Sequence, residues 1–185
     1  MAHLTGKQVL ALVTNYGVEQ DELLVPIRHL RDHGAVVTLA AVTGDAVRTL
    51  VGDEKPGEAV APDTTIDAVD PAGFDLLLVP GGTINADSLR LQSPAVSVVE
   101  AFTSSGRPVA AICHGPWMLV EAGKVSGATL TSYPSLATDI RNAGGTWVDE
   151  PVVQDDGAGF PLITSRNPRD IPHFLREIDK VLDAA

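Results

Sequence analysis

The chain has 185 residues, enough to bury a hydrophobic core without disulfides or metal ions, and its single cysteine excludes an internal disulfide. Its 13 Lys and Arg against 24 Asp and Glu give a net charge of −11, which argues against a nucleic-acid-binding surface because such surfaces need clustered cations. It shows no basic-then-apolar leader and no apolar run of membrane-spanning length. We therefore expect a single cytoplasmic domain over residues 1–185 with no membrane partner.

Short apolar runs in the first half of the chain predict buried strands of a parallel sheet, because such strands are covered on both faces. These runs lie at 8–14, 36–42 and 75–79. Leucine and isoleucine at helical spacing predict a helix between the first two strands, ending near His33. Residues 43–75 are polar and contain Pro and Gly, so only a short edge strand at 64–67 is predicted there.

The second half of the chain continues this alternation of strands and helices. Strands are predicted at 108–112, 129–132, 146–154 and 162–165, the third of them broken by Pro151. Helices are predicted at 93–105, 117–122, 135–143 and 168–182. The alternation predicts an α/β protein with a mostly parallel sheet, right-handed crossovers and helices on both faces.

The strand ends of this sheet carry the candidate functional residues. Ligands of such sheets bind at the carboxyl ends of the strands. Three features follow strands in this way: the loop with Glu19, the Pro-Gly-Gly turn at 80–82, and Cys113. They are far apart in the sequence, but we expect them to converge into one site.

Cys113 lies in the run Ala-Ile-Cys-His-Gly-Pro at 111–116, between a predicted strand and a predicted helix. A lone cysteine among apolar residues is often only a small buried side chain. Here His114, Gly115 and Pro116 suit a sharp turn that starts a helix, as at the nucleophile elbow of some hydrolases. The helix N-terminus favours a thiolate, so we expect Cys113 to have a lowered pKa and to act as a nucleophile.

Several spaced motifs together resemble the PfpI intracellular-protease family of the DJ/ThiJ/PfpI superfamily. They are the run around Cys113, Val-Pro-Gly-Gly at 79–82, Glu19 with Glu22-Leu23 and Pro26, Thr-Ser-Tyr-Pro at 131–134 and Thr-Ser-Arg at 164–166. The motifs occur in matching order over nearly the whole chain. The resemblance implies a flavodoxin-like sandwich related to class I glutamine amidotransferases.

The resemblance also implies a nucleophile and an acid. Cys113 matches the nucleophile, and Glu19 matches an acid that hydrogen-bonds the sulfur and moves protons. Because Glu19 is followed by Gln20 and Asp21 where the family commonly has an immediate Asp, Glu22 is the alternative acid. Judged without the resemblance, Glu19 fits a solvated residue in the first turn of a helix better than a catalytic acid.

Further roles are implied around this pair. His114 matches a histidine that an acid from a neighbouring subunit orients, and Asp87 lies at the position of that acid, so we expect a homodimer or a higher homo-oligomer. The backbone amides of Gly82 and His114 match an oxyanion-binding pair. Trp117 and Tyr133 are expected to line the pocket. No metal ion or other cofactor is implied.

Three functions are consistent with these residues. The first is a stress-response enzyme that converts 2-oxoaldehydes such as methylglyoxal, free or attached to protein or nucleotide amines, without glutathione. In this glyoxalase- or deglycase-like reaction Cys113 adds to the aldehyde, Glu19 moves a proton and water releases a 2-hydroxy acid. The second is an oligomeric cysteine peptidase with His114 as general base, although consecutive Cys and His make that geometry harder to build. The third is a redox-responsive protein in which Cys113 is oxidised.

Overall fold

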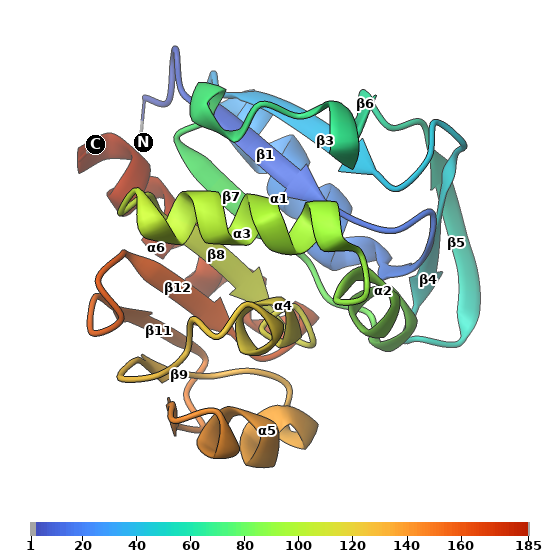
Figure 1. Ribbon diagram of the computed structural model, residues 1–185. Helices are drawn as coiled ribbons and strands as arrows, with labels where there is room; N and C mark the ends of the chain where they lie inside the picture. Colours follow the sequence, from blue (N-terminus) through green and yellow to red (C-terminus); the bar gives the residue numbers. More distant parts are fainter. Residues whose placement is uncertain (1–2, 185) are drawn as a thin grey trace.

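The computed structural model describes residues 3–184, which are organised around a seven-stranded sheet (Figure 1). In spatial order its strands are β11 (Val152–Asp155), β12 (Leu162–Ser165), β8 (Val109–Ile112), β7 (Leu76–Val79), β1 (Gln8–Leu12), β3 (Val36–Ala41) and β6 (Thr64–Thr65). Every neighbouring pair is parallel except β11 and β12. The carboxyl ends of the central strands therefore meet at one edge, as predicted.

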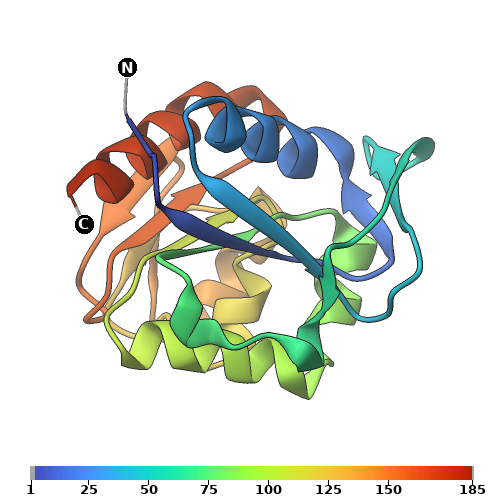
Figure 2. The ribbon, with the colours of Figure 1, turned by 90° about the horizontal axis from the view of Figure 1, so that it is seen from above.

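Helices cover both faces of this sheet (Figure 2). One face carries α1 (Gln20–Asp32) and α6 (Ile171–Ala184), and the other carries α3 (Ser93–Ser104) and α4 (Trp117–Glu121). This arrangement confirms the predicted flavodoxin-like sandwich with helices on both faces of a mostly parallel sheet.

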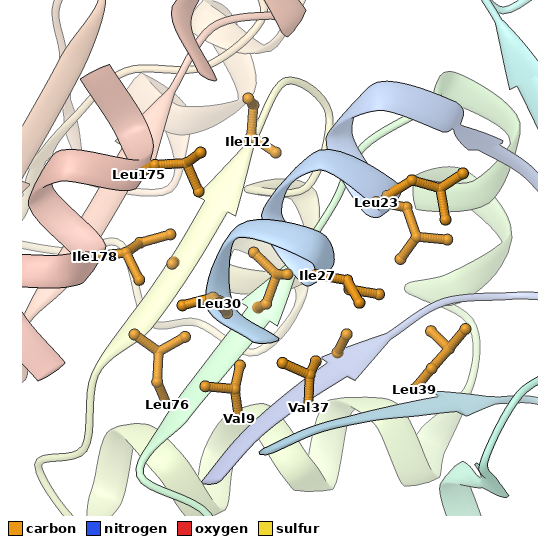
Figure 3. Packing of buried hydrophobic residues seen from close by; sticks show 14 of the residues in the cluster. Val9, Leu23, Ile27, Leu30, Val37, Leu39, Leu76, Ile112, Leu175 and Ile178 are labelled. Carbon is orange, nitrogen blue, oxygen red and sulfur yellow. The ribbon is translucent and has the colours of Figure 1, made fainter. Parts of the chain in front are cut away.

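The core consists of two apolar layers, one on each side of the sheet. Successive side chains of a strand point to opposite faces, so Val9 and Ala11 of β1 belong to one layer while Leu10 and Leu12 belong to the other. Figure 3 shows the first layer, in which Leu23, Ile27 and Leu30 of α1 lie over Val9, Val37 and Leu39. Strands buried on both faces explain why continuous apolar runs predicted them correctly.

A smaller sheet projects beside the main one and was not predicted from the sequence. It contains β2 (Tyr16–Glu19), β4 (Val47–Val51) and β5 (Lys55–Val60), in the order β2-β4-β5. Five of the six residues of β5 are exposed, so this strand has no apolar alternation to reveal it. We refer to this sheet as the arm.

Several other elements differ from the prediction. The helix α2 (Thr83–Leu89) was not predicted, and the strand expected at 146–154 consists of two, β10 (Thr146–Trp147) and β11. β10 pairs with β9 (Thr129–Leu130) in a separate two-stranded sheet, so 129–132 is not a strand of the main sheet. The remaining elements are α5 (Ala137–Asn142) and short 3₁₀ turns at Ile66–Ala68, Pro71–Gly73, Pro134–Leu136 and Pro168–Asp170.

The helices of this fold are short. The longest, α6, has 14 residues, and within residues 3–184 none has the length and apolar character needed to cross a bilayer.

Candidate active site

A pocket of about 370 Å³ opens beside Cys113 at the carboxyl edge of the main sheet. The side chains that line it include Glu19, Glu22, Asp53, Thr83, His114 and Tyr133. The three sequence features expected to converge do converge here. The pocket also takes residues from the arm, which the sequence did not indicate.

Cys113 occupies the sharp turn that the sequence predicted. Its φ of 61° lies in the left-handed region, which a residue with a side chain adopts only when the surrounding structure enforces it. The enforcement comes from both sides: the Cys113 amide donates to the Ser165 carbonyl oxygen at 3.0 Å, and the Tyr133 amide donates to the Cys113 carbonyl oxygen at 2.8 Å. A side chain at Gly115 would lie 2.3 Å from the Val79 carbonyl oxygen, so only glycine fits after His114.

The Pro-Gly-Gly turn after β7 brings backbone against the cysteine. A Cβ on Gly81 would lie 2.8 Å from the Cys113 Cβ, and one on Gly82, whose φ is 80°, would lie 2.2 Å from the Gly17 carbonyl oxygen. Buried Asn85 of α2 holds the turn in place, because its amide donates to the Gly81 carbonyl oxygen at 2.9 Å. Both glycines are therefore needed for this close approach.

Glu22 supplies the carboxyl group that lies beside the Cys113 thiol, because a Cβ on Gly81 would lie 2.6 Å from the Glu22 Oε2 and 2.8 Å from the Cys113 Cβ. Its side chain is 0% exposed, and its Oε2 accepts a hydrogen bond from the Gly81 amide at 2.8 Å. The other oxygen, Oε1, has no hydrogen-bond partner among the described residues. Burial raises the pKa of Glu22 from 4.5 to about 8, so the carboxyl is mostly protonated at neutral pH.

Glu19 lines the same pocket, but among the described residues the structure shows no hydrogen bond between it and the Cys113 sulfur, contrary to the prediction. It is the N-cap residue of α1, and its Oε2 accepts a hydrogen bond from the Asp53 amide of the arm at 3.2 Å. Burial raises the pKa of Glu19 as well. Glu22 is almost one helical turn further along α1, on the side that faces the sheet. Glu22 comes four and eight residues before the buried Pro26 and Leu30, and this helical spacing is the signal that could have chosen between the two acids.

The thiol itself also differs from the prediction. Burial, followed by the neighbouring Glu22 carboxyl, raises the pKa of the Cys113 thiol, while hydrogen bonds from the backbone amides of Gly82 and His114 oppose that rise. The helix after the turn, α4, has only five residues, and its dipole does not outweigh the burial of a side chain that is 5% exposed. These two amides are therefore close to the sulfur, and their role as an oxyanion-binding pair stays a prediction.

His114 lies directly against the thiol, with its Nδ1 3.2 Å from the Cys113 Sγ. Consecutive Cys and His therefore do form a close pair, because the left-handed turn at Cys113 brings the two side chains together. The His114 ring is stacked on Tyr133 at 4.7 Å between centroids, and its burial lowers its pKa, which favours a neutral imidazole. Neutral imidazole can accept the thiol proton.

The two aromatic residues expected in the pocket have different positions. Tyr133 lines the pocket and is 42% exposed. Trp117 does not line it: its ring lies 5.3 Å from the His114 ring, and its Nε1 donates to Asp139 at 2.8 Å. Trp117 therefore packs beside the His114 ring without lining the pocket.

Two acids, Asp87 and Asp53, are candidates for the group that orients His114. Asp87 lies exposed on α2 and outside the pocket, so its role across a subunit interface stays a prediction. Asp53, in the turn between β4 and β5, accepts hydrogen bonds from the Thr83 amide at 2.9 Å and from the Thr83 hydroxyl at 2.6 Å. The Thr83 hydroxyl oxygen is in turn 3.4 Å from the His114 Nε2. Asp53 falls in the segment 43–75, where no sequence pattern indicated a functional residue.

No group of three or more His, Cys, Asp or Glu side chains within residues 3–184 has the arrangement of a metal site. The chemistry available to the site comes from a thiol, an imidazole, two carboxyl groups and backbone amides. These groups suit addition to a carbonyl followed by proton transfer.

Comparison with known proteins identifies relatives of nearly the whole chain. Deglycase PH1704 of Pyrococcus horikoshii is 39% identical over 175 residues, which cover 95% of this chain and 99% of the relative. Protein/nucleic acid deglycase 2 of Escherichia coli is 39% identical over 181 residues, covering 97% and 99%. Each similarity extends well beyond the motifs around Cys113.

Solved structures show the same likeness in three dimensions. DJ-1beta of Drosophila melanogaster superposes with a TM-score of 0.84 at 31% identity, over 97% of this chain and 91% of its own. The model of the DJ-1/PfpI family matches residues 7–180, which include the turn at Cys113, Glu22 and the Pro-Gly-Gly turn. The protein therefore belongs to the DJ-1/PfpI family.

Proposed function

We propose that this protein is a cysteine-dependent enzyme that converts 2-oxoaldehydes such as methylglyoxal, free or attached to amines of proteins or nucleotides, without glutathione. The observation that carries the proposal is the position of the buried, mostly protonated Glu22 beside the Cys113 thiol, with the backbone amides of Gly82 and His114 close to the sulfur. The names of the two deglycase relatives support the same chemistry.

The first step adds the thiol to the aldehyde. His114 Nδ1, 3.2 Å from the Cys113 Sγ, takes the thiol proton, and the sulfur bonds to the aldehyde carbon. The oxygen of that carbonyl group takes the proton of Glu22, which leaves a hemithioacetal, an imidazolium ion and a Glu22 carboxylate. The amides of Gly82 and His114 stabilise the negative charge that develops on the oxygen.

The second step is an internal transfer of hydrogen. The Glu22 carboxylate takes the proton from the former aldehyde carbon, and the His114 imidazolium gives its proton to the neighbouring carbonyl oxygen, which forms an enediol. Glu22 then returns its proton to the adjacent carbon while the hydroxyl of the first carbon gives its proton back to His114, which leaves the thioester of a 2-hydroxy acid. Water then cleaves the thioester, which releases the acid and restores the thiol. For methylglyoxal the product is lactate, and the overall reaction consumes one water molecule. A raised pKa lets the same Glu22 act first as acid and then as base.

The charge of the pocket favours small uncharged substrates. Its lining includes the carboxyl groups of Glu19, Glu22 and Asp53 but no Lys or Arg. An anionic aldehyde would find no compensating cation here, whereas methylglyoxal carries no charge. A volume of about 370 Å³ is ample for a three-carbon aldehyde or for the end of a modified side chain.

Lactate formation from methylglyoxal, followed by NMR without glutathione, tests this proposal. We expect the wild type to form lactate, Cys113→Ala to be inactive and Glu22→Gln to be strongly impaired. Glu100→Gln, an exposed carboxyl on α3 outside the pocket, serves as the matched control and should retain full activity. A wild-type protein that forms no lactate under these conditions would refute the proposal.

Peptide cleavage is the second candidate, and the 3.2 Å contact between Cys113 and His114 favours it. Under this hypothesis Asp87 of a neighbouring subunit orients His114, so activity depends on a homodimer or a larger homo-oligomer. Light scattering combined with a fluorogenic peptide assay tests the dependence, since a monomer that cleaves peptides would contradict it.

Redox sensing is less well supported, because oxidation follows exposure and thiolate character, and the Cys113 thiol is buried with a raised pKa.

A further inference from the structure

The turn between β4 and β5 places an acid beside the active-site histidine within a single chain. Asp53, at this turn, has a φ of 58°, a left-handed conformation that Asp and Asn adopt more readily than most residues. Asp53 fixes the turn to the pocket by two hydrogen bonds, because its amide donates to Glu19 at 3.2 Å and its carboxylate accepts from the Thr83 amide at 2.9 Å. The turn is thereby joined to Glu19, where β2 ends and α1 begins, and to α2.

The hydrogen bonds of Thr83 determine which way its hydroxyl proton points. The Asp53 carboxylate accepts from the Thr83 amide at 2.9 Å and from the hydroxyl at 2.6 Å. A carboxylate can only accept, so the single hydroxyl proton of Thr83 is directed to Asp53. The hydroxyl oxygen, 3.4 Å from the His114 Nε2, is then left to accept a proton from that nitrogen.

The second neighbour of the same nitrogen is compatible with this direction. Ser135 Oγ lies 3.3 Å from the His114 Nε2 and can accept a hydrogen bond, because its hydroxyl rotates freely between donor and acceptor roles. On the other side of the ring, Nδ1 faces the Cys113 thiol at 3.2 Å. The chain of contacts therefore runs from Asp53 through Thr83 to one nitrogen, and from the other nitrogen to the sulfur.

We propose that Asp53, acting through Thr83 of the same chain, holds His114 in the tautomer that carries its proton on Nε2. Nδ1 is then unprotonated where it faces Cys113, so the S–H bond can break while an N–H bond forms at Nδ1. The resulting imidazolium ion is stabilised by the charge of Asp53. Asp53 and Thr83 are positioning residues, and the proposal rests on the proposed function only for the use made of the thiolate.

Nitrogen NMR of the full-length protein labelled on its histidines tests the tautomer directly, and the His114→Gln variant assigns the resonance. We expect the wild type to show the Nε2–H form. Asp53→Asn removes the charge at a residue whose backbone conformation Asn tolerates, and Thr83→Val removes the hydroxyl; both should give a mixture of tautomers. Thr83→Ser keeps the hydroxyl and should restore the wild-type spectrum.

Lactate assays on the same variants give the second measurement. We expect kcat to fall by roughly tenfold or more for Asp53→Asn and Thr83→Val, with little change in KM and with recovery in Thr83→Ser. A merely structural role would not be rescued by the hydroxyl. If the wild type shows the Nε2–H tautomer but forms no lactate, the proposed function fails while the role of Asp53 stands.

The variant Asp87→Asn tests the competing explanation, in which an acid of another subunit orients His114. If an acid from another subunit orients His114, this variant changes the tautomer while Asp53→Asn does not, and that outcome overturns the proposal. A wild-type His114 protonated on Nδ1 would overturn it as well. Melting temperatures of all variants show whether the arm still folds.

Discussion

The pocket has a floor and a rim that are held in different ways. The floor consists of Glu22, Gly81, Gly82 and Cys113, which lie at the ends of main-sheet strands and on the inner side of α1 and are all buried. The rim consists of Glu19, Gly52, Asp53 and Thr83, three of which are exposed and which are joined to one another by hydrogen bonds. Packing therefore fixes the floor, whereas polar contacts at the surface fix the rim.

Glu19 and Glu22 show what this difference does to the same type of side chain. They are three residues apart, yet one receives a hydrogen bond from the arm and the other contacts the thiol. Desolvation is the main cause of a raised pKa at both, and at the fully buried Glu22 it raises the pKa to about 8. Depth in the core, more than sequence neighbourhood, decides which carboxyl group can carry a proton at neutral pH.

The largest effect is expected for Glu22→Gln. Glutamine keeps the shape of the side chain and can still accept from the Gly81 amide, but it cannot transfer a proton. We expect kcat for lactate formation to fall by about 10²- to 10⁴-fold, the range typical for loss of general acid and base catalysis. A decrease smaller than about tenfold would show that the floor does not supply the acid.

Gly82→Ala tests the close packing of the floor. The new Cβ would lie 2.2 Å from the Gly17 carbonyl oxygen and 2.6 Å from the Glu19 amide nitrogen, in a residue with positive φ. Gly106→Ala is the matched control, since Gly106 also has positive φ but nothing within 4 Å of the new Cβ. Conformational strain alone costs about 1–2 kcal/mol. Chemical denaturation should therefore show a clearly larger loss for Gly82→Ala, and equal losses would contradict the clash.

The buried carboxyl of Glu22 should also make stability depend on pH. Its pKa is about 8 in the folded protein against an ordinary value of 4.5, so the folded state binds more protons than the unfolded state between these values. The contribution of Glu22 to stability is thus fully present below pH 4.5 and is lost as the pH rises through about 8. Between pH 4.5 and about 8, the melting temperature of the wild type should fall relative to that of Glu22→Gln. Parallel curves of melting temperature against pH for the two proteins would refute the raised pKa of Glu22.

The smallest effect is expected for Glu19→Gln at the rim. Glutamine can still accept the hydrogen bond from the Asp53 amide, and the thiol contacts Glu22 instead. We expect kcat to change by less than about tenfold, because no general acid or base is removed. Both variants are assayed together. If kcat falls as much in Glu19→Gln as in Glu22→Gln, the proton-transfer role belongs to Glu19.

The floor was largely predictable from the sequence and the rim was not. Continuous apolar runs such as Leu76–Val79 predict strands buried on both faces, and they led directly to the turns that follow. The choice of Glu19 over Glu22 followed the resemblance to the PfpI family and overlooked the helical face on which Glu22 lies. Asp53 belongs to a hairpin whose second strand is mostly exposed, so its position depends on hydrogen bonds to Thr83, thirty residues away, that no local pattern reveals.

The chain contains one cysteine, and it lies at the bottom of the pocket with 5% of its surface exposed. Chemical labelling of this protein therefore has a single possible thiol target. A small alkylating reagent such as iodoacetamide should add one equivalent, whereas the bulk of a long polymer maleimide should keep it out of the pocket. The mass of the intact protein after alkylation then counts competent active sites in any preparation, and protection by an aldehyde measures how many are occupied.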